Sequence, residues 1–430
     1  MTIPADTIAG VRRTLGLLAI VAAALVLSPT AGGSTASSHE GLTPVVLFPA
    51  FHFTKLEVTV HDQTAFPGCP RSGSFQDWFL NPHQGTTFSQ ICRDELLTLR
   101  YDRHSRKPMR LRFSNQRGVS VRIIDYGRPA SAPFYGPLYR ALEAEGYVAG
   151  RNIRVPGYDA RLTPDMGGFL RRTKRLVEQT YRQNGNRPVQ LIGHSNGPLY
   201  AQYLLTHTSH AWRHRYIHGF SPIAGNLPGQ GSVYSLLFTG LNIEDFTYPT
   251  TPAQAKSSAD MYLTAPSSWM SAADPKIFGH SEVVVKDVAT GRSYTPAGWP
   301  RLLRDAHLRW LIPVARHYIG FVKFADRAHF PDVDVHAEKG SGIPTVVGAV
   351  LPNLHVGQVL DPNTATFILR DGDVNQEQTT NLATLVWRRM SCFRYRLTNH
   401  PGVDHFSLPS NPSVIHLLMA DLRRPRSTCG

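Results

Sequence analysis

Short apolar runs alternate with longer amphipathic stretches through the middle of the chain. Residues 44–49 and 188–192 are mostly apolar and end in turns, which is typical of buried strands. Residues 163–184 carry a long helical pattern, and residues 198–206 are helix-like. Further strand-like runs occur at residues 121–125, 152–155 and 216–223, and a further helical pattern occurs at residues 137–145. This alternation predicts an α/β fold with a mostly parallel sheet flanked by helices.

The alternation fails between about residues 224 and 340, where Gly, Pro, Ser and aromatic residues are frequent. It returns with strand-like runs at residues 344–350 and 365–369, and a helical pattern at residues 412–422 precedes the C-terminus. We therefore interpret residues 224–340 as a cap inserted into one α/β domain. The two parts of that domain would span residues 42–223 and 341–430.

The N-terminus has the pattern of an export signal. Arg12 and Arg13 precede the apolar run LGLLAIVAAALVL at residues 15–27, and small residues follow it. Such an arrangement predicts a secretory signal peptide in residues 1–36. An uncleaved anchor is the alternative, although the run is short for a bilayer span. We therefore expect a protein that is secreted or anchored at the cell surface.

Four cysteines are present, namely Cys69, Cys92, Cys392 and Cys429. An even number in an exported chain predicts two disulfides. Proximity along the chain favours the pairs Cys69–Cys92 and Cys392–Cys429, although three pairings are open. No Cys or His pair has the spacing of zinc ligands, so we predict no metal, and no cofactor is expected.

The chain is basic, with 45 Lys and Arg against 31 Asp and Glu, and its formal net charge is +14. Such an excess favours polyanionic partners, either nucleic acid or anionic lipid headgroups. The basic residues are scattered, and no zinc-finger or dinucleotide-type motif organises them, which argues against nucleic acid. The charge therefore favours an anionic lipid surface, or it serves only solubility.

The pentapeptide at residues 193–197 (GHSNG) matches the pattern G-x-S-x-G. In this pattern the serine lies on a tight strand-to-helix turn, and the flanking glycines let strand and helix approach without a Cβ clash. The required context is present, because PVQLI precedes the motif and the helix-like PLYAQYLL follows it. The motif therefore predicts an α/β-hydrolase fold with Ser195 as nucleophile.

A serine hydroxyl is a good nucleophile only when a histidine accepts its proton and a carboxylate orients that histidine. In this class the chain order is serine, acid, histidine. Asp373, after the strand-like ATFIL, is the predicted acid, and Asp371 is its competitor. His405, in a turn-rich loop before the last helix, is the predicted base. His400 is the alternative base, and Asp404 is a weaker candidate for the acid.

The tetrahedral intermediate of acyl transfer needs two backbone N–H donors. The residue after the nucleophile, Asn196, supplies one of them, and an early strand-to-helix loop supplies the other. That loop is expected at residues 49–53 (PAFHF). Backbone donors leave almost no residue-type signature, so this assignment rests on position in the chain.

Several segments, taken together and in order, resemble the lecithin:cholesterol acyltransferase and lysosomal phospholipase A2 family. They are PVVLFPAFHFTKLEV (44–58), the Cys69-to-Cys92 segment, EGYVAGRNIRVPGYDARLTP (145–164), PVQLIGHSNGPLYAQYLL (188–205), RDGDVNQEQT (370–379) and HPGVDHFSL (400–408). The resemblance covers most of the chain outside the signal and parts of the cap. It includes the family's oxyanion loop, lid loop, nucleophile elbow, acid loop and histidine loop.

The resemblance implies Ser195, Asp373 and His405 as a catalytic triad, with the backbone N–H groups of His52 and Asn196 binding the oxyanion. It also implies transfer of a fatty acyl group from a phospholipid to water or to an alcohol, such as a sterol. The Cys69-to-Cys92 segment would be a disulfide-closed lid loop that touches the membrane.

Four positions depart from the family's pattern. Ala50 and Phe53 stand where glycines are frequent, which makes the oxyanion loop bulkier. Asn196 replaces the usual apolar residue after the nucleophile. The Thr-Val that follows the acid in the family is lost, since Val374-Asn375 follows Asp373 directly. These departures leave the expected triad intact, but they bear on the substrate and the acceptor.

Trp78 and Phe79 lie with Phe75 and Leu80 in one short stretch of the expected lid loop. Aromatic side chains favour the headgroup boundary of a membrane. We therefore expect Trp78 and Phe79 to contact an anionic membrane or lipoprotein surface, unless they pack under the cap. Three functions are open: an interfacial lipid acyl hydrolase or acyltransferase, a soluble carboxylesterase, and a catalytically silent lipid-binding protein.

Overall fold

The computed structural model describes residues 41–78, 87–101, 111–240, 251–359 and 366–427. Its centre is a six-stranded sheet in the order β15–β12–β9–β8–β1–β7. The strands are β1 (Val45–Phe48), β7 (Ile153–Arg154), β8 (Val189–His194), β9 (Ile217–Ile223), β12 (Asp334–Ser341) and β15 (Tyr395–Pro401). All neighbouring pairs in this sheet are parallel. The predicted α/β fold with a mostly parallel sheet is therefore confirmed.

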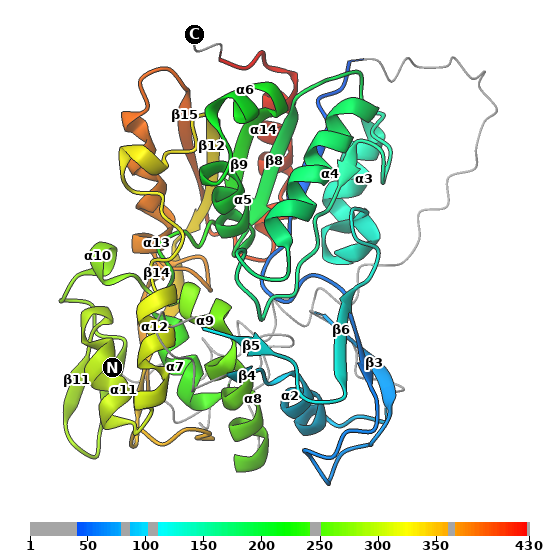
Figure 1. Cartoon of the computed structure of the whole chain (residues 1–430). Coiled ribbons are helices and arrows are strands. Elements are labelled where there is room, and N and C mark those ends of the chain that lie inside the picture. The colour runs from blue at the N-terminus through cyan, green and yellow to red at the C-terminus, as the bar shows by residue number, and fades with distance from the viewer. Residues whose placement is uncertain (1–40, 79–86, 102–110, 241–250, 360–365, 428–430) are drawn as a thin grey trace, which may run out of the picture.

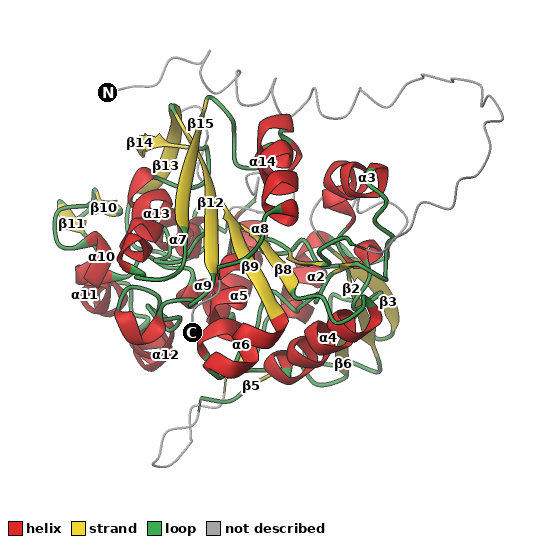
Figure 2. Ribbon diagram, turned by 90° about the horizontal axis from the view of Figure 1, so that it is seen from above, coloured by secondary structure: helices red, strands yellow, loops and turns green. Residues whose placement is uncertain are grey.

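Helices cover both faces of the central sheet, as Figure 2 shows. On one face lie α3 (Gly136–Ala144) and α14 (Pro412–Arg423), and on the other lie α4 (Phe169–Gln183), α5 (Gly197–Thr206) and α6 (His210–Tyr216). This arrangement fits a sheet whose strands are joined by helical crossovers, because each crossover leaves a helix packed on one face.

The apolar run of β1 is unbroken because both faces of this strand are buried. Val45 and Leu47 belong to a hydrophobic cluster that includes side chains of α3 and α14. Val46 and Phe48 belong to the cluster on the opposite face, with side chains of α4 and α5. All four side chains are at most 1% exposed. Burying each of them contributes roughly 1.5–3 kcal/mol, so a polar residue at any of these positions would be costly.

The Cys-bounded segment and its neighbours form a small region that we call the lid. It contains the antiparallel sheet β3–β2–β6, the helix α2 and a two-stranded ribbon. Its elements are β2 (Leu56–Val60), β3 (Gly73–Asp77), α2 (Gln90–Leu97), β4 (Arg100–Tyr101), β5 (Phe113–Ser114) and β6 (Val119–Ile123). The Cys69–Cys92 disulfide closes the lid, as the sequence predicts.

The cap consists of short helices packed beside a second, four-stranded sheet in the order β11–β10–β13–β14. Its helices are α7 (Ser232–Thr239), α8 (Pro252–Thr264), α9 (Pro266–Met270), α10 (Pro275–Phe278), α11 (Trp299–Asp305) and α12 (Ile312–Tyr318). Its strands are β10 (Val285–Asp287), β11 (Arg292–Tyr294), β13 (Ile343–Leu351) and β14 (Thr366–Gly372). Cap and lid lie together below the central sheet in Figure 1.

The structure places three segments differently from the sequence pattern. β12 lies inside residues 224–340 and yet belongs to the central sheet. β13 and β14, where the strand rhythm returns, pair with each other antiparallel in the cap sheet. α4 begins later than its pattern, because Gly167 and Gly168 have φ of +55° and +68° and interrupt the right-handed helix before Phe169.

Residues 1–40 lie outside the described residues, so the signal peptide and the export it implies stay predictions. Within the described part of the chain, no helix combines the length and the apolar character needed to cross a bilayer.

Candidate active site

Ser195 lies on a sharp turn between β8 and α5. Its φ is +59°, in the left-handed region that is strained for a residue with a side chain. A Cβ on Gly197 would lie 2.1 Å from the carbonyl oxygen of Phe48, and one on Gly193 would lie 2.8 Å from the nitrogen of Pro198. Both motif glycines are therefore required by close backbone approach. Ser195 itself is buried, with 6% of its surface exposed.

The predicted acid and base meet in the structure. Asp373 follows β14, His405 follows β15, and His405 Nδ1 lies 3.2 Å from Asp373 Oδ2. The His405 N–H also donates to the Asp373 carbonyl oxygen at 2.8 Å. Asp373 Oδ1 accepts backbone N–H groups from Asn375 at 3.2 Å and Gln376 at 2.7 Å. These contacts hold a fully buried carboxylate against one ring nitrogen of His405.

The other ring nitrogen of His405 is the one that a nucleophile would use. His405 Nε2 is buried and makes no hydrogen bond with any described residue, Ser195 included. The ring lies beside the elbow, because the ring of His194, the neighbour of Ser195, is 4.8 Å from it between centroids. Catalytic hydrogen bonds are often long before substrate binds, so this arrangement suits a base that awaits its proton donor.

The competing residues have other partners. Asp371 accepts the backbone N–H of Gly342. Asp404 caps its own turn through the backbone N–H groups of Phe406 and Ser407. His400 pairs with Glu338 on β12, with Nε2 2.6 Å from Oε2. Of the candidate acids and bases named from the sequence, only Asp373 and His405 are joined to each other.

The two predicted oxyanion residues lie at the expected loops. His52 follows β1 and has φ of +58°, and Asn196 is the N-cap residue of α5. The helix N-terminus contributes partial positive charge at Asn196. The Asn196 side chain donates to Ser271 Oγ at 2.9 Å and accepts from Asn226 Nδ2 at 2.7 Å. The polar residue at this position is therefore satisfied by the cap and by the loop after β9.

The His52 side chain connects the oxyanion loop to the lid. Its Nδ1 lies 3.7 Å from Asp77 Oδ2 at the end of β3, and both side chains are buried. Its ring packs against Phe51 and, at 6.4 Å between centroids, against Tyr262 of the cap helix α8. Sequence reasoning missed Asp77, Asn226 and Ser271, because no motif marks contacts between segments so far apart in the chain.

The aromatic stretch of the lid is divided between core and surface. Trp78, directly after β3, is partly exposed, and Phe79 and Leu80 lie outside the described residues. Phe75 is buried, with its ring 5.0 Å from that of Phe88. Of this stretch, Phe75 is therefore part of the lid core, and contact of Trp78 and Phe79 with a membrane stays a prediction.

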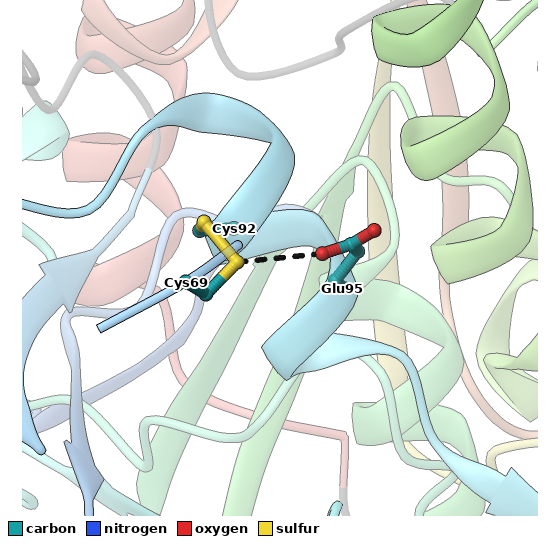
Figure 3. A group of neighbouring side chains, drawn as sticks. All are labelled: Cys69, Cys92 and Glu95. Carbon is teal, nitrogen blue, oxygen red and sulfur yellow. Dashed lines mark hydrogen bonds between the residues drawn. A yellow bond between two sulfur atoms is a disulfide. The ribbon is translucent and has the colours of Figure 1, made fainter. Parts of the chain in front are cut away.

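The Cys69–Cys92 disulfide lies beside Glu95, whose Oε2 is 3.4 Å from Cys69 Sγ (Figure 3). These three residues are the one cluster of potential metal ligands found within the described ranges. Both sulfurs are committed to the disulfide and offer no thiolate, so the cluster is not a metal site. Cys392 is also disulfide-bonded, but Cys429 lies outside the described residues, so the second pairing stays a prediction.

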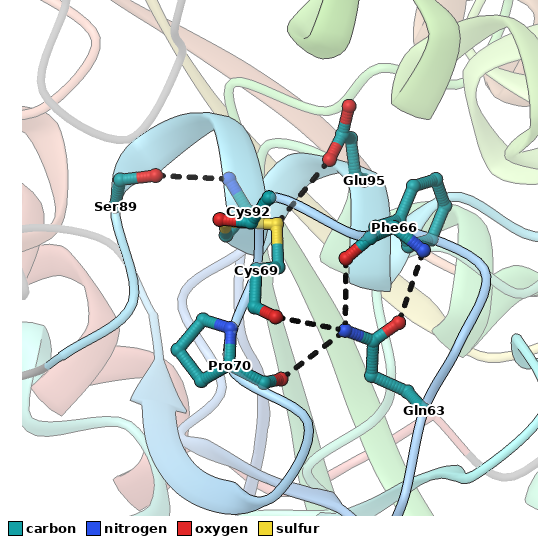
Figure 4. Close-up of a disulfide and its surroundings, with 8 residues drawn as sticks. Gln63, Phe66, Cys69, Pro70, Ser89, Cys92 and Glu95 are labelled. Carbon is teal, nitrogen blue, oxygen red and sulfur yellow. Dashed lines mark hydrogen bonds between the residues drawn. A yellow bond between two sulfur atoms is a disulfide. The ribbon is translucent and has the colours of Figure 1, made fainter.

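Gln63 holds the chain on one side of this disulfide, as Figure 4 shows. Its Nε2 donates to the carbonyl oxygens of Phe66, Cys69 and Pro70 at 3.0–3.2 Å. On the other side, Ser89 Oγ caps α2 by accepting the Cys92 N–H at 3.3 Å. The lid is therefore fixed by local hydrogen bonds as well as by its covalent bridge.

A buried serine on a strained strand-to-helix turn of a parallel sheet, followed in the chain by a paired acid and histidine, defines the α/β-hydrolase class. The solved structure titled "The crystal structure of Tle4-Tli4 complex" supports this fold. It matches with a TM-score of 0.51 and 11% identity, covering 89% of this chain and 98% of that chain.

Comparison with other sequences shows which family the chain is similar to. The family model described as lecithin:cholesterol acyltransferase matches residues 84–292. Lysosomal phospholipase A and acyltransferase of Mus musculus is 25% identical over 72% of this chain and 74% of the relative. Lecithin-cholesterol acyltransferase-like 1 of Oryza sativa subsp. japonica is 25% identical over 90% of this chain and 88% of the relative. These relatives are named as acyltransferases and phospholipases, and the chain is an enzyme similar in sequence to the lecithin:cholesterol acyltransferase and lysosomal phospholipase A2 family.

Proposed function

We propose that the chain transfers a fatty acyl group from a phospholipid to an alcohol or to water, through an acyl ester on Ser195. The observation that carries this proposal is the buried Asp373–His405 pair beside the strained elbow, with His405 Nε2 left without a partner among the described residues. A carboxylate on Nδ1 keeps the proton there and leaves Nε2 as the proton acceptor.

The reaction follows from these positions. His405 Nε2 takes the proton of Ser195 Oγ as the oxygen attacks the ester carbonyl of the phospholipid. The backbone N–H groups of His52 and Asn196 bind the oxyanion of the tetrahedral intermediate. His405 then gives the proton to the departing lysophospholipid oxygen, and the acyl group stays on Ser195. Water or an alcohol, deprotonated by the same histidine, releases the acyl group.

Three observations support a lipid substrate at an interface. A relative of 25% identity from Mus musculus is named phosphatidylcholine-sterol acyltransferase, and others are named lysosomal phospholipase A and acyltransferase. The net charge of +14 attracts anionic lipid. Trp78 is partly exposed at the end of β3, where an aromatic ring can enter the headgroup region. A membrane or lipoprotein surface is the partner that these features suit.

The test is lipid mass spectrometry after the purified protein is incubated with phospholipid vesicles and a sterol. We expect a Ser195-dependent sterol ester or, when water accepts, free fatty acid with lysophospholipid. Ser195→Ala should abolish both products, and the matched variant Ser410→Ala, at an exposed serine, should retain them.

The alternatives give different results. Turnover of dispersed short-chain esters without faster turnover on vesicles would identify a soluble carboxylesterase. A protein that binds vesicles and resists labelling by a fluorophosphonate probe would be a silent lipid-binding protein, because only an activated serine reacts readily with that probe.

A further inference from the structure

His194, the residue before the nucleophile, is fully buried and uses both ring nitrogens. Its Nδ1 lies 3.0 Å from Tyr135 Oη, and its Nε2 lies 3.0 Å from the backbone carbonyl oxygen of His405. Tyr135 in turn accepts the backbone N–H of Ala50 on its hydroxyl at 2.8 Å. Ala50 belongs to the oxyanion loop, so one chain of hydrogen bonds joins that loop to the loop of the base.

The donor and the acceptor of each hydrogen bond in this series can be assigned. The carbonyl oxygen of His405 can only accept, so His194 Nε2 must carry a hydrogen. Burial, followed by the nearby His405, holds the pKa of His194 well below its usual range, so the ring is neutral and Nδ1 carries a lone pair. The Ala50 N–H can only donate, so the Tyr135 hydroxyl accepts from Ala50 and donates to Nδ1.

Each group in this series of hydrogen bonds is therefore either a donor or an acceptor at each contact, with no alternative. All four residues are at most 3% exposed, so no bulk water can replace a missing partner. A buried donor or acceptor that loses its partner keeps its full cost of desolvation. The chain thus holds Ala50, Tyr135, His194 and the His405 backbone in one relative arrangement, and it fixes a single tautomer of His194.

We propose that Tyr135 and His194 are positioning residues that hold the oxyanion loop and the loop of the catalytic base in register with the nucleophile elbow. This inference rests on the proposed function, in which His405 is the base and His52 supplies an oxyanion donor. Tyr135 comes from the 3₁₀ turn Pro133–Tyr135, 59 residues from His194 and 85 residues from Ala50.

Loss of the Tyr135 hydroxyl would free both loops at once. The Ala50 N–H and His194 Nδ1 would lose their partners, and small displacements of catalytic groups cost large factors in rate. Substrate binding depends on other surfaces, so KM should change little. A role confined to stability would lower the melting temperature without this selective loss of kcat.

Tyr139 offers a matched control. It is buried on the next helical turn, and within the described part of the chain its hydroxyl donates to the Ala132 carbonyl oxygen alone, at 3.1 Å. Tyr135→Phe should lower kcat on a dispersed ester and the rate of fluorophosphonate labelling of Ser195 by about 10- to 100-fold, with KM within about 2-fold. For Tyr139→Phe, both rates should stay within about 2-fold of those of the unmodified protein. Its melting temperature should fall by about as much as that of Tyr135→Phe. Equal rates for the two variants would overturn the proposal.

A second measurement does not depend on activity. In protein labelled with ¹⁵N-histidine, the His194 signal is assigned by its loss in His194→Gln. It should report a hydrogen on Nε2 and a hydrogen-bonded lone pair on Nδ1, and Tyr135→Phe should shift the Nδ1 resonance whereas Tyr139→Phe should not. A hydrogen on His194 Nδ1 of the unmodified protein would refute the proposed series of hydrogen bonds. If the fluorophosphonate probe does not label Ser195 of the unmodified protein, the proposed function fails. The tautomer of His194 then tests the hydrogen-bonded arrangement of Tyr135 and His194 by itself.

Discussion

Two regions of the molecule bury a carboxylate, and they surround it differently. At the edge of the central sheet, Asp373 receives two backbone N–H groups and the His405 ring. At the seam between lid and cap, the side chain of Asp94 on α2 receives, from the described residues, the hydroxyls of Ser257 and Ser258 on α8. Two of the three donors in the first set are backbone N–H groups, whereas the second set is made of rotatable side chains.

The difference in donors affects the pKa of Asp94 at the seam. Burial raises the pKa of Asp94 to about 7, more than the two hydroxyls and the neighbouring Arg93 lower it. The seam therefore changes charge near neutral pH. The comparison teaches that backbone donors hold a buried carboxylate in one geometry, whereas burial with hydroxyl donors alone leaves the carboxyl of Asp94 easier to protonate.

The largest expected effect belongs to the sheet edge. Asp373→Asn removes the carboxylate that keeps the proton on His405 Nδ1, so kcat should fall by about 10⁴-fold while the fold is retained. Asp371→Asn and Asp404→Asn, at the competing acids, should change kcat by less than about 10-fold. Steady-state kinetics of the three variants checks this assignment. A larger loss in Asp371→Asn than in Asp373→Asn would reverse it.

The next effect belongs to the seam and depends on pH. The folded-state pKa of Asp94 is raised above its unfolded value, so the folded protein holds this proton up to about pH 7 and the unfolded chain releases it near pH 4. The contribution of Asp94 to stability is therefore greatest below pH 4 and is lost as pH rises to about 7. At about 1.4 kcal/mol per pKa unit, the loss is at most about 4 kcal/mol.

Asp94→Asn tests this linkage, because the amide can still accept from the serines and cannot ionise. Relative to the unmodified protein, the variant should gain stability as pH rises from 4 to 7, with activity changed by only a few-fold. Denaturant unfolding at several pH values measures the difference. Asp260→Asn, at a partly exposed carboxylate on α8, is the control and should not reproduce the gain.

Removal of the lid disulfide should have a smaller effect. The bridge joins residues 23 apart, and replacement of Cys69 and Cys92 by Ser should cost about 3 kcal/mol of stability by loop-closure entropy. Denaturant unfolding checks this value. Turnover on vesicles should fall more than turnover on dispersed esters, since Ser195, Asp373 and His405, the proposed triad, lie outside the lid. An equal fall on both substrates would mean that the lid supports the site itself.

The smallest expected effect concerns the acceptor. Asn196→Leu restores the apolar residue usual in the family and leaves Asn226 Nδ2 and Ser271 Oγ without their present partner. We expect the ratio of sterol ester to free fatty acid to rise by a few-fold, because the site becomes less polar and less suited to water. The vesicle assay measures this ratio, and an unchanged ratio would mean that Asn196 does not influence the choice of acceptor.

Local signals in the chain were sufficient for part of the fold and part of the site. The elbow at Ser195, the buried strands β1 and β8, and the lid disulfide depend on neighbours within a few to about twenty residues. Their glycines, apolar runs and close cysteines carry the information directly. The late start of α4 was missed, because the φ values of Gly167 and Gly168 depend on how the preceding loop packs.

Sequence by itself thus determined the class of fold, the elbow that carries the predicted nucleophile and the family resemblance, because these follow from short-range geometry and the order of motifs. Only the tertiary structure showed that Asp373 pairs with His405, that Asp371 and His400 have other partners, and which sheet receives β13 and β14. It also revealed the contact of Tyr135 with His194. The physical reason is that these choices rest on hydrogen bonds and strand pairings between segments far apart in the chain, which no local pattern encodes.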